Sequence, residues 1–247
     1  MSKSTDPSQN PTPEDEYSSH AVVTDANRYR KALKIIHLLQ EYVQLQSCDL
    51  LDIGTGSGHV ISRIARVCKS ATSVNVEDER VIKDGYHFQQ VPDVSLPFAD
   101  ESFDVVISNQ VIEHIPPQEE HIKEIYRVLK KGGVVYMATP SKYAVIEPHF
   151  RLPFLSWLPR SVADRYVRFF GHDHFDVYPL SYRQLRGLIA GRFRMENVMP
   201  RLLHQPRRYE LDMVPRWHPL LERLPHWLLP LLGPLVPSFI VILQKEA

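Results

Sequence analysis

Apolar residues along the chain follow two spacings in turn. From Ala26 to about Gln46 they recur every three or four positions, with Leu33, Ile36 and Val43 on one face. This spacing predicts an amphipathic helix that packs over a sheet. At residues 48–53 the pattern changes to CDLLDI, a short apolar run stopped by glycines. Such a run predicts a buried strand, and HVISRIARVCK, which comes after the glycines, predicts the next helix.

The later apolar runs predict further strands separated by helices. ATSVNVE, FDVVISN and GVVYMAT each predict a strand. Residues 118–129 place their apolar side chains on one face of a helix that is expected to stop at KKGG. SYRQLRGLIAGRF predicts a helix ending near Gly191, and FRMENVM and SFIVILQ predict a closing pair of strands. Strands joined by helical crossovers indicate an α/β domain with a parallel sheet.

Three stretches without a regular period set the predicted domain organisation. Residues 1–20 are polar and rich in proline, which predicts a disordered tail before one domain at 21–247. Proline and aromatic residues mix at about 142–180 and again at 201–237, which predicts lid-like insertions over the carboxyl edge of the sheet. Prolines interrupt the longest apolar stretch, so no membrane-spanning helix is expected.

Composition and charge narrow the functional classes. The 247 residues, 43% of them hydrophobic, can bury the core of one α/β domain, and the formal net charge is zero. No global field therefore indicates a specific nucleic-acid partner. Residues 1–150 hold 15 Lys and Arg against 21 Asp and Glu, whereas residues 151–224 hold 13 Lys and Arg against 7 Asp and Glu. The positive charge of the second segment would suit an anionic substrate or surface. Two cysteines without disulfide spacing predict a cytoplasmic setting.

The strongest functional pattern is the segment from Asp52 to Gly58, DIGTGSG. Its glycines at 54, 56 and 58 remove side chains at a turn from strand to helix, so that the backbone can approach a ligand. A dinucleotide fingerprint would place its third glycine at His59 instead. The spacing therefore favours a different nucleotide-like ligand.

LLDIGTGSG resembles the first motif of class I S-adenosylmethionine-dependent methyltransferases, in the small-molecule group similar to methyltransferase type 11. The resemblance runs from about Leu50 to Ser141 and resumes weakly at HFDVYPLSYRQLRGLI. It implies a Rossmann-like, mostly parallel seven-stranded sheet with helices on both faces and a terminal antiparallel strand. It also implies S-adenosyl-L-methionine as the cofactor, whose amino acid end the glycine loop wraps.

Other residues are predicted to hold the rest of the cofactor. Glu77 follows a strand about 25 residues after Asp52 and can accept hydrogen bonds from ribose hydroxyls, although a solvated acidic turn is the alternative. In the stretch PDVSLPF, Asp93 matches the acid that the family uses for the adenine amino group, one residue closer to LPF than in many relatives. The expected cofactor-binding set is Asp52, Gly54, Thr55, Gly56, Gly58, Glu77, Asp93, Val94, Ser108 and Asn109.

Candidate catalytic residues are histidines near the carboxyl edge of the sheet. His114, in a Glu-His pair that resembles a recurring family pair, and His149, in the first insertion, are the candidates for removing a proton from an acceptor hydroxyl. Structural roles are the alternative for both. The group at 172–174, His-Asp-His, lacks a complete coordination set, so no metal is expected.

The sequence favours methyl transfer to a small-molecule acceptor, such as a hydroxyl of a lipid, quinone-like compound or glycan. Methylation of RNA or protein, and an inactive cofactor-binding interaction module, stay open as alternatives. A further hypothesis joins residues 143–168 and 224–237 into an amphipathic cover suited to a lipid or lipid-linked substrate, which adds peripheral membrane contact to the cytoplasmic expectation. An ordinary core-facing lid over a soluble acceptor is the alternative. The oligomeric state stays undetermined.

Overall fold

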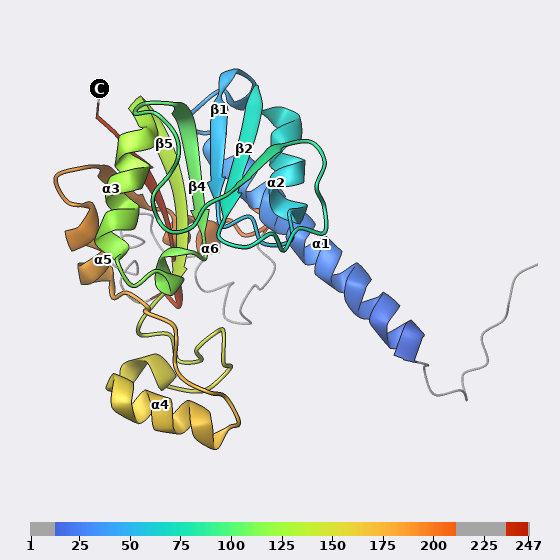
Figure 1. Cartoon of the computed structure of the whole chain (residues 1–247), viewed down its shortest axis with the longest axis vertical. Helices are drawn as coiled ribbons and strands as arrows, with labels where there is room; N and C mark the ends of the chain where they lie inside the picture. The colour runs from blue at the N-terminus through green and yellow to red at the C-terminus, as the bar shows by residue number, and fades with distance from the viewer. Residues whose placement is uncertain (1–12, 211–235, 247) are drawn as a thin grey trace, which may run out of the picture.

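The computed structural model describes residues 13–210 and 236–246, and its centre is a seven-stranded sheet (Figure 1). The strand order is β3-β2-β1-β4-β5-β7-β6, with β1 to β5 parallel and β7 antiparallel to both of its neighbours. The strands are β1 Asp49–Ile53, β2 Ser70–Asn75, β3 His87–Gln90, β4 Phe103–Asn109, β5 Leu129–Pro140, β6 Arg194–Asn197 and β7 Ser238–Gln244. The predicted fold class, including the antiparallel terminal strand, is confirmed.

Helices cover both faces of this sheet, with α1 and α2 on one side and α3 and α5 on the other (Figure 1). The α-helices are α1 Pro13–Leu39, α2 His59–Ile64, α3 Gln118–Val128, α4 Arg160–Phe169, α5 Tyr182–Ile189 and α6 Met199–His204. The 3₁₀ turns within residues 13–210 are η1 Leu45–Ser47, η2 Ala65–Val67, η3 Ile112–His114 and η4 Leu155–Trp157. Because helices lie on both faces, the central strands are largely buried on both sides and contain apolar runs such as Val105–Ile107 and Val134–Ala138.

Element boundaries differ from the sequence prediction in three places. The first helix begins at Pro13 and ends at Leu39, rather than running from Ala26 to Gln46. Part of the predicted tail is therefore helical, and residues 1–12 lie outside the described residues. The strand β2 ends at Asn75, two residues before Glu77. The KKGG segment lies inside β5, which begins at Leu129 directly after α3, so its glycines do not cap that helix.

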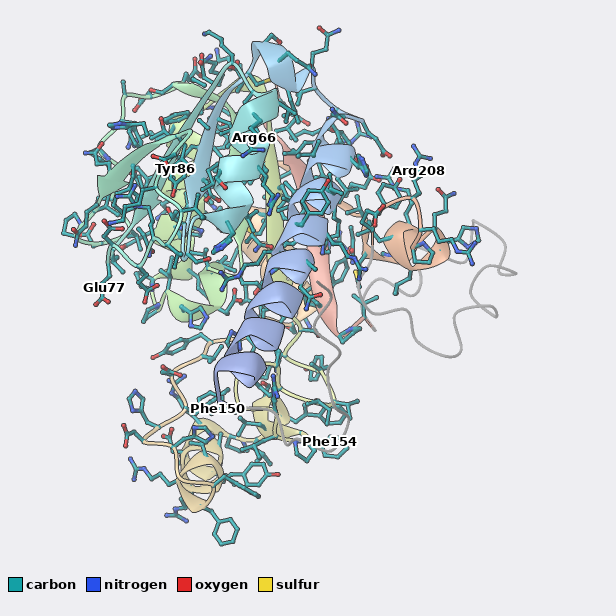
Figure 2. All side chains as sticks on the ribbon, turned by 90° about the vertical axis from the view of Figure 1, so that its right-hand side faces the viewer. Arg66, Glu77, Tyr86, Phe150, Phe154 and Arg208 are labelled. Atoms are coloured by element: carbon teal, nitrogen blue, oxygen red, sulfur yellow. The ribbon has the colours of Figure 1, made fainter. Side chains whose placement is uncertain are left out.

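The first predicted insertion forms a separate small unit. It leaves the sheet at the carboxyl end of β5, contains η4 and α4, and lies apart from the main body (Figures 1 and 2). Its own apolar cluster consists of Leu152, Leu155, Ala163, Val167, Phe175 and Val177. Most of the second predicted insertion, residues 211–235, lies outside the described residues. Among the residues that are described, no helix is both long and apolar enough to cross a bilayer.

Candidate functional site

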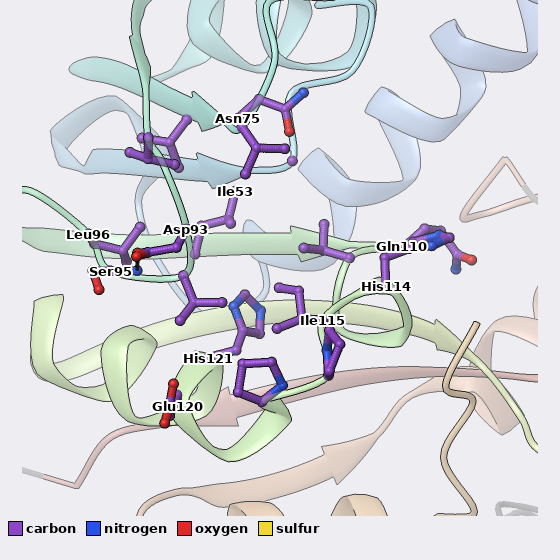
Figure 3. A pocket seen from close by; sticks show the side chains of 18 of the residues that line it. Ile53, Asn75, Asp93, Ser95, Leu96, Gln110, His114, Ile115, Glu120 and His121 are labelled. Carbon is purple, nitrogen blue, oxygen red and sulfur yellow. Dashed lines mark hydrogen bonds between the residues drawn. The ribbon is translucent and has the colours of Figure 1, made fainter. Parts of the chain in front are cut away.

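A cavity of about 630 Å³ opens at the carboxyl ends of β1, β2 and β4 (Figure 3). The chain crosses to β2 on one side of β1 and to β4 on the other, and ligands of open α/β sheets bind at such a switch point. The lining comes from the glycine loop, the end of β2, the loop before β4 and the segment after β4. It comprises Ile53, Gly54, Gly56, Val74, Asn75, Val76, Glu79, Val91, Asp93, Val94, Ser95, Leu96, Gln110, Val111, His114, Ile115, Pro116, Pro117, Glu120 and His121.

The three glycines of the loop serve different needs. All have positive φ, at +83° for Gly54, +50° for Gly56 and +80° for Gly58. A Cβ at Gly54 would collide with the Val111 side chain, and one at Gly58 would collide with the carbonyl of Ile82. A Cβ at Gly56 would meet no atom within 4 Å. Because Gly56 also lines the cavity, its missing side chain leaves space for a ligand rather than for the protein.

Asp52 and Thr55 lie behind the cavity wall and are absent from its lining. The Asp52 side chain is buried, and burial raises its pKa to about 7. The Thr55 hydroxyl forms a hydrogen bond with the Ser73 hydroxyl and donates to the Val74 carbonyl at 3.2 Å. Thr55 therefore holds the glycine loop onto β2 and acts on a ligand only through the loop.

At the end of β2, Asn75 and Glu79 line the cavity and Glu77 does not. The Glu77 side chain is exposed and points away from the body of the protein (Figure 2). The Asn75 side-chain amide donates to the Glu77 carbonyl at 3.0 Å, which fixes the turn after the strand. Since β2 ends two residues earlier than predicted, Asn75 and not Glu77 is the last residue of the strand and lies at the cavity.

Asp93 and Val94 line the cavity, as the predicted adenine contact requires. The Asp93 carboxylate accepts the backbone N–H of Ser95 at 2.7 Å, which makes a tight turn. Two residues of α3 hold the following segment: Glu124 accepts the Leu96 N–H at 2.8 Å, and Arg127 donates to the Leu96 carbonyl at 2.8 Å. This Glu-Arg pair fixes one wall of the cavity from a helix that carried no functional signal in the sequence.

At the end of β4, Ser108 and Asn109 lie outside the lining, whereas the next residue, Gln110, lines the cavity with a φ of +60°. Ser108 is fully buried, and its hydroxyl lies 3.0 Å from Nε2 of His121. Burial lowers the pKa of His121 to about 4, so this ring is neutral near pH 7. Ser108 thus positions a neutral imidazole at the cavity wall, opposite Asn75 in Figure 3.

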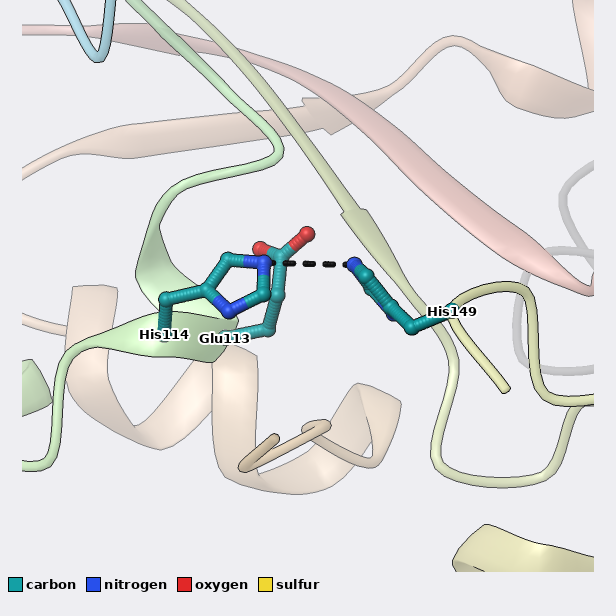
Figure 4. A group of neighbouring side chains, drawn as sticks. All are labelled: Glu113, His114 and His149. Carbon is teal, nitrogen blue, oxygen red and sulfur yellow. Dashed lines mark hydrogen bonds between the residues drawn. The ribbon is translucent and has the colours of Figure 1, made fainter. Parts of the chain in front are cut away.

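Both candidate catalytic histidines lie together (Figure 4). His114 lines the cavity, and its Nε2 is 3.2 Å from Nε2 of His149, which comes from the first insertion. The Glu147 carboxylate holds His149 through a 2.8 Å contact with Nδ1, which raises the pKa of His149. Burial acts the other way on His114 and lowers its pKa.

Glu113 lies beside this histidine pair at the start of the segment after β4. Its side chain is fully buried, and burial raises its pKa to about 7. One carboxylate oxygen accepts a hydrogen bond from Thr139 at 3.0 Å. No local sequence signal marks Glu147 or Thr139, because only the folded chain brings them next to His149 and Glu113.

Comparison with known proteins identifies the domain. Residues 51–137 match the methyltransferase domain family. The chain is 33% identical over 135 residues to a ubiquinone biosynthesis O-methyltransferase from Paramagnetospirillum magneticum, a match of 48% of this chain and 53% of the relative. It is 31% identical over 126 residues to an arsenite methyltransferase from Mus musculus, a match of 42% of this chain and 33% of the relative. These matches thus span only a third to about half of the relatives' own lengths.

The fold is also similar to that of a solved methyltransferase. The crystal structure of an S-adenosylmethionine-dependent methyltransferase from Methanosarcina mazei superposes with a TM-score of 0.53 at 20% identity, over 85% of this chain and 97% of that one. The cavity at the switch point, the glycine loop beside it and the family match over that loop agree with one another. Residues 51–137 thus match the methyltransferase domain family, and the chain as a whole shares the fold of a solved S-adenosylmethionine-dependent methyltransferase.

Proposed function

We propose that this protein transfers the methyl group of S-adenosylmethionine to an oxygen atom of a small-molecule acceptor. The cavity carries the proposal. Its lining includes Gly56, where no protein atom fills the space of a side chain, and His114, which can face an acceptor. Its volume of about 630 Å³ is typical of sites for small molecules.

The polar groups of the lining suit the parts of the cofactor. The backbone at Gly54 and Gly56 can approach the amino acid end closely, because no side chain intervenes. Asn75 and Glu79 supply oxygen acceptors for ribose hydroxyls at the end of β2. Asp93 supplies a carboxylate for the adenine amino group. The ribose role predicted for Glu77 therefore passes to Asn75 and Glu79 in our proposal.

Methyl transfer to a hydroxyl demands an aligned acceptor and the loss of one proton. The acceptor oxygen forms a bond to the methyl carbon as the sulfur–carbon bond breaks, and the sulfur leaves as a neutral thioether. Alignment and exclusion of water therefore supply much of the rate. The hydroxyl proton must also leave, and His114 at the cavity wall, paired with His149, is the group placed to promote this.

The acceptor itself is the least constrained part of the proposal. The relatives include a ubiquinone biosynthesis O-methyltransferase and an arsenite methyltransferase, so matches of similar identity concern proteins with different acceptors. We favour an oxygen acceptor because of the histidine pair, since a hydroxyl benefits from proton removal at the moment of transfer.

Two measurements on the purified protein test this function. Calorimetry should show binding of S-adenosylmethionine and of S-adenosylhomocysteine, and none of NAD. Incubation with methyl-labelled S-adenosylmethionine and fractionated small metabolites should then give a labelled product that base does not hydrolyse, as expected for an ether. Label that enters only RNA or protein would reject the small-molecule acceptor, and cofactor binding without any transfer would favour an inactive binding module.

A further inference from the structure

We propose that Glu113, His114 and His149 form a binding site for a divalent first-row transition metal ion at the edge of the cofactor cavity. One ligand atom from each residue lies within 4.8 Å of the other two. The three side chains come from the end of β4 and from the first insertion, and they converge in Figure 4. This inference replaces the expectation of no metal, which considered only histidines close together in the sequence.

The two histidines are spaced as ligands of one ion. Their Nε2 atoms are 3.2 Å apart, with the rings nearly perpendicular at 87°. Two imidazole nitrogens that are each about 2.1 Å from a common ion lie about 3–3.5 Å from each other. The observed separation of the two nitrogens therefore matches that of two ligands of one ion.

Glu113 supplies a buried oxygen that lacks a partner. Thr139 donates to Oε2 at 3.0 Å, but Oε1 is buried and meets no hydrogen-bond donor within the described part of the chain. A buried carboxylate oxygen in this state is costly, because it has lost its hydration without replacement. A cation beside it supplies the missing interaction. The ligand atoms of the three residues lie within 4.8 Å of one another, so the carboxylate has to approach the histidines by about 1–2 Å to share an ion with them.

Glu147 prepares His149 for this role. Its carboxylate contacts Nδ1 of His149 at 2.8 Å and also accepts the backbone N–H groups of His149 and Phe150 at 2.8 and 2.7 Å. A proton on Nδ1 leaves the lone pair of Nε2 directed at His114. A carboxylate behind a histidine is the usual support of a metal ligand, since it fixes the ring and its tautomer.

The donor set selects the class of ion. Two imidazoles and one carboxylate suit divalent zinc, manganese, iron or cobalt, whereas magnesium and calcium prefer oxygen ligands. Three protein ligands also leave at least one coordination position open. His114 lines the cavity, so the open position would face the acceptor. The role of the ion rests on the proposed function: it would lower the pKa of the acceptor hydroxyl and so promote its deprotonation, with His114 acting as a ligand rather than as the base.

Cobalt binding tests the site without any use of activity. Wild-type protein stripped with a chelator should bind one Co²⁺ per chain by calorimetry and develop visible d–d absorption. His149→Ala should weaken this binding at least about 100-fold, and Glu147→Gln about 10–100-fold, the usual effect of removing the support of a ligand. His174→Ala is the matched control, since His174 is an exposed histidine of the same insertion outside the cluster, and it should bind as the wild type does.

Cofactor binding by each variant verifies that it is folded. If stripped wild-type protein binds S-adenosylmethionine but not Co²⁺, Zn²⁺ or Mn²⁺, the metal site is rejected, and the methyltransferase proposal stands. The site is also rejected if His149→Ala and His174→Ala weaken Co²⁺ binding equally. Metal binding lost selectively in His149→Ala supports the site even where no acceptor is methylated, an outcome that would reject only the proposed function.

Discussion

Gly56 offers the sharpest test of where the cofactor lies. Its φ of +50° is in the left-handed region, so Gly56→Ala should lower the free energy of unfolding by roughly 1–2 kcal/mol. No protein atom lies within 4 Å of the added Cβ, so no further loss of stability is expected. The methyl group instead enters the cavity that Gly56 lines. Forcing one methyl into a fitted contact costs about 1–3 kcal/mol, which is roughly a 5–150-fold increase in Kd for S-adenosylmethionine.

Gly191 provides the matched control. It has a φ of +76°, its added Cβ would also meet no atom within 4 Å, and it lies outside the cavity lining. Gly191→Ala should therefore lose similar stability in urea titrations but bind S-adenosylmethionine like the wild type in calorimetry. If folded Gly56→Ala keeps wild-type affinity, or if both variants lose affinity equally, the placement of the cofactor against the glycine loop is wrong.

Three further predictions follow from the site and the surface. Asn75→Ala should weaken S-adenosylmethionine binding by about 1–3 kcal/mol in calorimetry, while Glu77→Ala changes it by less than about 0.5 kcal/mol; the reverse order would restore the ribose role to Glu77. Burial raises the pKa of Asp52 to about 7 from 3.8, so the folded state keeps a proton that the unfolded state loses as pH rises between these values. Asp52→Asn should thus add up to about 4 kcal/mol of stability to urea at pH 8 and almost none at pH 4, and equal gains would refute burial as the cause. Phe169 and Phe170 of the α4 unit are 84% and 53% exposed. The wild-type protein should therefore float with anionic vesicles at low salt, and the variant with serine at both positions should not. If the wild-type protein does not float, the membrane hypothesis is wrong.

Local sequence patterns were sufficient for the elements that surround the cofactor. The strand β1, its glycine loop and α2 are contiguous, so one apolar run followed by glycines predicted all three. The pairing of β6 with β7 was predicted from two apolar runs at the end of the chain. These elements were predicted because their signals come from neighbouring residues, whereas the local KKGG signal failed as a helix stop because that segment pairs into β5.

Features that depend on distant contacts were placed less well or missed. The end of β2 is set by its pairing with β1, which stops at Val74, and with β3, which stops at Asn75. No local signal distinguishes Asn75 from Glu77. The contact between His114 and His149 joins positions 35 residues apart, across β5. Both histidines were candidates, but their mutual distance and the partnership with Glu113 arise only when the first part of the insertion is placed beside the segment after β4.

The order of strands in the sheet also affects how the protein is made. β5 pairs with β7, and Thr139 lies opposite Phe239, a hundred residues later in the chain. At about 5–20 residues per second, a ribosome needs on the order of 5–20 s to synthesise that interval. During this time one edge of β5, whose residues Val134–Ala138 are apolar, has no strand to pair with. An unpaired apolar edge promotes aggregation, so the nascent chain is most in need of a chaperone after β5 emerges and before β7 does.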